Sequence, residues 1–171
     1  MFSHGVIAGL LFAVVGRIVY ERTHTRRLDA LQAMPLHHLL PFGAVVFVLA
    51  GMASMGMPGF SGFPAELAIL IGTWKASPIW ALFAAAGILV AAAFTLRVVQ
   101  VSFFGRTASV SDPAPANEHP FAPVTWPEKA GAALLLASTV LIGLRPDLLL
   151  NWITPALQSP LMQAALKGGR P

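Results

Sequence analysis

The chain has 171 residues, of which 56% are hydrophobic and only 11% charged, and its mean hydropathy is +0.72. Soluble domains carry roughly 25% charged residues, so this composition excludes an ordinary soluble domain and indicates that lipid surrounds most of the chain. The absence of cysteine excludes a disulfide framework, thiol catalysis and cysteine-ligated zinc or iron–sulfur sites. The net charge of +4 does not indicate nucleic-acid binding, because the arginines adjoin apolar runs in the positive-inside pattern of membrane proteins.

The first apolar run covers residues 1–20 and is long enough to cross about 30 Å of hydrocarbon as a helix. A basic connector at 21–38 follows it. The second run, residues 39–75, is interrupted by two prolines and two glycines: Pro58, Gly59, Gly62 and Pro64. These residue types break a helix, and the part after them is short for a separate span. We therefore expect one discontinuous span over 39–75, with two separate spans as the alternative.

The third apolar run, residues 79–104, is rich in alanine and long enough to span with a tilt. The segment 106–125 holds prolines among small polar residues, which is typical of a loop outside the membrane. The run 126–145 predicts a final span, and the tail 146–171 is mildly amphipathic and predicted to lie on the membrane surface. The predicted fold class is therefore all-α transmembrane, with about four spanning helices.

Glu66 is the first candidate for chemistry. An ionised carboxylate in hydrocarbon costs at least a few kcal/mol, so acidic residues within spans face a bundle interior or water and tend to be functional. Glu66 also follows a predicted helix break, and unpaired backbone at membrane depth persists only beside protein or a hydrated cavity. Two interpretations fit equally well: a proton site, or a carboxylate that caps the second half-helix at an interface.

Other ionisable residues have weaker claims. Histidine side chains in water have a pKa near 6.5, so His4 could carry a proton, although a structural role is more usual for a lone histidine. Arg97 lies about 12 Å from the end of its run, within reach of the interface for a long side chain. Lys75 is expected to anchor the far end of the broken span. The remaining histidines fall in connectors, where no metal-ligand spacing appears: His24, His37, His38 and His119.

Several motifs resemble one known family. They are Met1-Phe2-Ser3-His4-Gly5, Tyr20-Glu21-Arg22-Thr23-His24-Thr25-Arg26, Met55-Gly56-Met57-Pro58-Gly59-Phe60-Ser61-Gly62-Phe63 with Glu66, and Phe103-Phe104-Gly105. Together they resemble the M-type, antiporter-like subunits of bacterial NADH-quinone oxidoreductase (respiratory complex I). The related L and N subunits usually have lysine at the break, so the glutamate favours the M type.

The resemblance implies the C-terminal part of a fourteen-helix subunit, with residues 1–105 as a partial second repeat. It implies that Glu66 is the terminal proton site and His4 an upstream relay, in a translocase subunit that performs no redox chemistry itself. Arg26 matches a family arginine; Arg97 and Lys75 are possible supporting residues. NADH, FMN, iron–sulfur clusters and quinone are expected in other subunits. The expected partners are L- and N-type subunits, in the bacterial inner membrane.

The chain also departs from the family pattern. The first repeat and the start of the second are missing, and Val101 stands where the family has an arginine. We therefore expect a fragment or a split gene product. The alternatives are a structural or assembly fragment without its own channel, or the equivalent module of a membrane hydrogenase or a multisubunit cation/proton antiporter.

Overall fold

The computed structural model describes residues 1–32, 36–104 and 121–160, and all regular structure within these ranges is helical. Most of the predicted proline-rich loop, including His119, and the tail beyond residue 160 lie outside them. The elements are α1 (Phe2–Phe12), the π-helical η1 (Ala13–Tyr20), α2 (Glu21–Thr23), α3 (Leu28–Gln32), α4 (Leu36–Leu39), α5 (Pro41–Ser54), α6 (Gly62–Ala76), α7 (Pro78–Phe103), α8 (Trp126–Leu144) and α9 (Asp147–Leu157).

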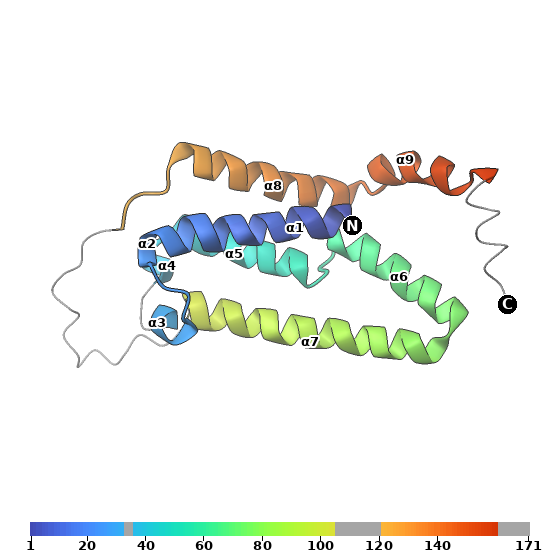
Figure 1. Cartoon of the computed structure of the whole chain (residues 1–171), viewed down its shortest axis with the longest axis horizontal. Helices are drawn as coiled ribbons and strands as arrows, with labels where there is room; N and C mark the ends of the chain where they lie inside the picture. The colour runs from blue at the N-terminus through green and yellow to red at the C-terminus, as the bar shows by residue number, and fades with distance from the viewer. Residues whose placement is uncertain (33–35, 105–120, 161–171) are drawn as a thin grey trace.

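Three helices of the described part are long and apolar enough to cross a membrane: Phe2–Thr23, in which α1, η1 and α2 run on without a gap, then α7 and α8. The next two are shorter, since α5 has 14 residues and α6 has 15. At a rise of 1.5 Å per residue each is about 21 or 22 Å long, less than the hydrocarbon thickness of about 30 Å. Figure 1 shows that α5 and α6 advance in one overall direction and that α7 returns beside them.

The all-α transmembrane prediction is therefore confirmed, and so is the interruption of the second span. The position of the break needs a correction. The sequence predicts it at Pro58–Pro64, but the non-helical residues run from 55 to 61 and Pro64 lies in the first turn of α6. Proline is tolerated there, because the first N–H groups of a helix have no carbonyl partner within it.

Two glycines make the turn of the break possible. Gly56 has a φ of 68° and Gly59 a φ of 100°, in the left-handed region that residues with a Cβ atom rarely enter. Most backbone N–H groups of the turn are paired; for example, the Met57 N–H donates to Met52 O and the Phe60 N–H to Met57 O, both at 3.2 Å. The break is thus an ordered, hydrogen-bonded turn between two helices.

The helices pack around α1, which contacts α5 and α8, while α7 contacts α5 and α6 (Figure 1). The larger core cluster joins η1, α5, α7 and α8 and includes Val14, Phe47, Phe103 and Ala132. The Phe47 and Phe103 ring centroids are 5.0 Å apart. A smaller cluster of Ile7, Ala53 and Phe60 lies at the break. Both clusters include residues of α1 or η1. The continuous helix formed by α1 and η1 is therefore the element against which the broken span packs.

Candidate functional site

A cavity of about 340 Å³ lies between the first turns of α1, the end of α5 and the first turns of α6. Its polar wall comprises Ser3, His4, Ser54 and Glu66, and its apolar wall includes Ile7, Leu11 and Ile69. The two residues singled out as proton carriers in the sequence therefore share one cavity beside the helix break. They come from different helices, since His4 lies on α1 and Glu66 on α6.

The Glu66 carboxyl lies directly against the backbone at Gly56. A Cβ atom added to Gly56 would overlap Glu66 Oε2 and lie 2.8 Å from its Cδ. Glycine at 56 thus serves two purposes: it adopts the positive φ of the turn, and it leaves room for the carboxyl group. Among the residues that the structure describes, Glu66 forms no ion pair. A carboxyl group in this setting, without a fixed cation, is suited to bind and release a proton.

Ser61 ties the break to two other helices. It occupies the N-cap position of α6, but its side chain makes no capping hydrogen bond. Instead its hydroxyl lies 2.8 Å from that of Ser3 on α1 and 3.1 Å from that of Thr139 on α8. The Ser61 N–H donates to the Thr139 carbonyl at 2.9 Å. This link was not foreseen from the sequence, where Ser61 was only one letter of the break motif.

The three possible supporting residues lie elsewhere. The Arg26 guanidinium stands 4.4 Å from the centroid of the Tyr20 ring, a cation–π contact at the opposite end of α1 and η1. Arg97 lines a separate hollow with Asp29, and Lys75 lines an apolar hollow between α6 and α7. The structure does not bring any of the three to the wall of the cavity that holds Glu66. A role for them in proton transfer remains a prediction.

The connector histidines do not form a metal centre in the part of the chain that the structure describes, where no three His, Asp or Glu residues gather at ligand distance. His37 and His38 have ring centroids 4.0 Å apart, and His37 stacks on Phe104 at 5.9 Å. The contact between His37 and Phe104 packs α4 against the end of α7.

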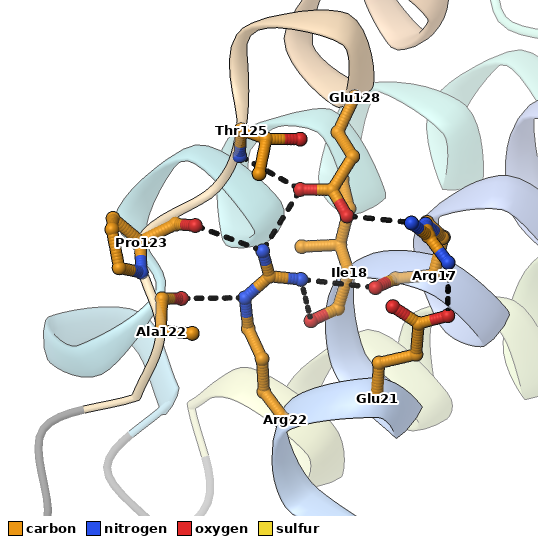
Figure 2. A network of polar contacts seen from close by, with 8 residues as sticks. All are labelled: Arg17, Ile18, Glu21, Arg22, Ala122, Pro123, Thr125 and Glu128. Carbon is orange, nitrogen blue, oxygen red and sulfur yellow. Dashed lines mark hydrogen bonds and ion pairs between the residues drawn. The ribbon is translucent and has the colours of Figure 1, made fainter.

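A second polar site joins the other end of α1 and η1 to the start of α8 (Figure 2). Arg22 and Glu128 form an ion pair at 2.8 Å, and their side chains are only 5% and 7% exposed. Arg22 also donates to the carbonyls of Ala122 at 2.7 Å and Pro123 at 3.1 Å. Glu128 in turn accepts from the Thr125 N–H at 2.8 Å, as part of the capping box that begins α8. One arginine thus holds both the approach to α8 and its first turn.

Two exposed side chains extend this cluster. Arg17 lies 3.3 Å from Glu128 through its Nε and is also paired with Glu21 one turn along the helix (Figure 2). In the sequence these arginines are only orientation signals. The Thr125–Glu128 spacing does indicate a capping box, but nothing local in the sequence identifies Arg22, 106 residues away, as its partner.

Comparison with known proteins places this geometry in a family. The family model described as "NADH:quinone oxidoreductase/Mrp antiporter, TM" matches residues 1–95, which include the whole wall of the cavity and the helix break. The chain belongs to this family. The match ends within α7, so that α8, with Glu128 and Thr139, lies beyond it.

Individual relatives agree with this assignment. The chain is 36% identical over 157 residues to the NADH-quinone oxidoreductase subunit M of Rhodobacter capsulatus, covering 92% of this chain and 29% of the relative. It is also 36% identical over 157 residues to the NAD(P)H-quinone oxidoreductase chain 4 1 of Synechococcus sp. strain JA-3-3Ab, over 86% of this chain and 28% of the relative. Identity to the subunit M of Rickettsia prowazekii is 30% over 151 residues. The chain thus spans a little under a third of the length of these relatives.

Proposed function

We propose that this membrane protein contributes the terminal part of a proton path to a NADH:quinone oxidoreductase, in which Glu66 accepts and releases the proton and His4 relays it. The observation that carries the proposal is the shared cavity, which brings a carboxyl group and an imidazole from two helices together beside a break in the second span. Imidazole changes its charge near neutral pH, which suits a relay. An intramembrane carboxyl group beside a broken helix suits a terminal site.

The remaining assignments are proposals that rest on the resemblance of the chain to its family. NADH oxidation and quinone reduction, with FMN and iron–sulfur clusters, belong in this proposal to other subunits, and the present chain has no cysteine with which to ligate a cluster. L- and N-type antiporter-like subunits are the proposed neighbours. The proposed location is the bacterial inner membrane.

The test is Glu66→Gln, measured in native membrane vesicles that contain the complete complex. We expect NADH-driven acidification of the vesicles, followed by quenching of a pH-sensitive dye, to fall to the level of uncoupled vesicles, while the assembled complex persists. Glu21→Gln is the matched control, because it removes one acid from an exposed ion pair outside the cavity. Undiminished acidification in the Glu66 variant contradicts the proposal and favours a scaffold role for the chain.

A further inference from the structure

The helix break is held by α8, a helix that contributes no residue to the cavity wall. Ser61 and Thr139 are 2% and 0% exposed. The Ser61 N–H donates to the Thr139 carbonyl and, at 3.4 Å, to the Thr139 hydroxyl oxygen, and the two hydroxyl groups lie 3.1 Å apart. Both side chains are withdrawn from water, where a lost hydrogen bond is not replaced by one to solvent. The contact joins positions 78 residues apart and lies at the point where α6 begins.

A close approach of the two backbones surrounds this contact. Gly143, one turn after Thr139 on the same face of α8, has no room for a side chain. A Cβ atom there would overlap the Gly59 carbonyl oxygen and lie 2.5 Å from the Phe60 Cα. The turn 59–61 thus packs directly against the surface of α8 formed by Thr139 and Gly143.

The surface formed by Thr139 and Gly143 is connected to the cavity through Ser61 and Ser3. The Ser61 hydroxyl also contacts Ser3 at 2.8 Å, and Ser3 is on the cavity wall with Glu66. On the chain itself, Ser61 directly precedes α6, and Glu66 follows in the second turn of that helix. Gly62 packs so closely that an added Cβ atom would lie 2.8 Å from the Ala53 carbonyl oxygen. With α6 held this tightly at its first residue, a shift of Ser61 moves Glu66 with it.

We propose that Thr139 is a positioning residue for Glu66. Acting through Ser61, its hydroxyl and carbonyl fix the start of α6, and so fix the place of the Glu66 carboxyl against Gly56 and within reach of the His4 cavity. The proposal deepens the proposed function and rests on it for its effect on proton transfer. It assigns a role in the site to a helix that lies outside the residues matched by the family model.

The informative variants distinguish the effect of the Thr139 hydroxyl from the effect of the size and branching of the side chain. Thr139→Val keeps the volume and the β-branch but removes the hydroxyl, whereas Thr139→Ser keeps the hydroxyl. Ser138→Ala is the matched control, because Ser138 is the adjacent residue on α8, is only half-buried, and donates to the Leu134 carbonyl of its own helix at 2.8 Å. If Thr139 serves packing alone, the valine variant behaves as wild type.

Two readouts are taken in native membranes that contain the complete complex. The first is the rate at which a membrane-permeant carbodiimide modifies Glu66, followed by mass spectrometry of the peptide that carries it. The second is the number of protons moved per NADH oxidised. We expect Thr139→Val to speed the modification about fivefold, the factor by which one net hydrogen bond biases an equilibrium, because the carboxyl group then leaves its place against Gly56. The same variant is expected to lower the proton number, while Thr139→Ser and Ser138→Ala match wild type.

The outcomes separate this proposal from the proposed function. Faster modification with an unchanged proton number supports the positioning role and contradicts Glu66 as the proton site. An unchanged modification rate in Thr139→Val overturns the positioning role, whatever the proton number. If that variant does not assemble, Ser61→Ala takes its place, since it removes the same hydroxyl contact and keeps the backbone bond. Modification of Ser61→Ala at the wild-type rate then overturns the proposal.

Discussion

At the scale of single residues, the Glu66 carboxyl fits its position because Gly56 has no side chain. The turn requires a φ of 68° there, which costs a residue with a Cβ atom roughly 1–2 kcal/mol. The same Cβ atom would overlap the carboxylate. Strain and overlap thus act together on one position, and both are relieved only if the turn or the carboxyl group moves.

Gly56→Ala is therefore expected to lower NADH-driven proton translocation nearly as far as Glu66→Gln does, with the complex still assembled. The measurement is vesicle acidification at matched rates of NADH oxidation. Gly72→Ala on α6 is the control, because an added Cβ atom there meets nothing within 4 Å, and alanine favours the helix. Equal translocation by the two alanine variants would show that the contact at Gly56 does not matter.

At the scale of elements, α8 is attached at both ends. Its first turn is held by the Arg22–Glu128 pair and its last turns rest on the break at Thr139 and Gly143. The first attachment is an ion pair withdrawn from solvent. Leaving one charge of such a pair without its partner costs about 3–5 kcal/mol, whereas exposed pairs contribute about 0–1 kcal/mol.

Glu128→Gln, which keeps the size of the side chain and leaves the Arg22 charge uncompensated, is expected to lower the midpoint temperature of unfolding clearly. The midpoint is measured on the complex in detergent by the loss of its monodisperse peak after heating. Asp147→Asn is the control, since the Arg145–Asp147 pair has side chains 67% and 50% exposed and is expected to shift the midpoint little. Comparable shifts in the two variants contradict a stabilising role for the Arg22 cluster.

At the scale of the whole molecule, the polar connectors gather at one end of the bundle. The hydrogen bonds from Arg22 to Ala122 and Pro123 place the segment before α8 beside the end of α2 (Figure 2). The turn between α6 and α7 lies at the opposite end (Figure 1). From the arginines of the first connector we predict that this end of the bundle faces the cytoplasm.

This topology is testable because the chain has no cysteine, so that a single introduced thiol reports its own side. A membrane-impermeant maleimide is expected to label Thr25→Cys and Ala122→Cys from the cytoplasmic face and Ala76→Cys only from the other face. The readout is labelling of right-side-out against inverted vesicles. Labelling of all three from one side would contradict the discontinuous span, since α5 and α6 together then would not cross the membrane.

The sequence by itself predicted the spans, the existence of the break and Glu66 as a candidate residue, whereas His4 was favoured only through the family resemblance. These are local properties: hydropathy over about 20 residues decides what enters lipid, and prolines and glycines within a few positions decide where a helix stops. Even so, the bounds of the break in the structure differ from the predicted ones. Pro64 belongs to the first turn of α6, where its missing N–H costs nothing. An acid in an apolar run, Glu66, also stands out without any structure.

Only the tertiary structure decided which distant residues meet. Ser61 and Thr139 are 78 residues apart and Arg22 and Glu128 are 106 apart, and neither pair has a periodicity or spacing that would identify it. Small hydroxyl residues and arginines at helix ends are common, so their partners follow from how helices cross. The break that stands out in the sequence thus has its position, and with it the place of Glu66, set by a helix that the sequence alone indicated only as a final span.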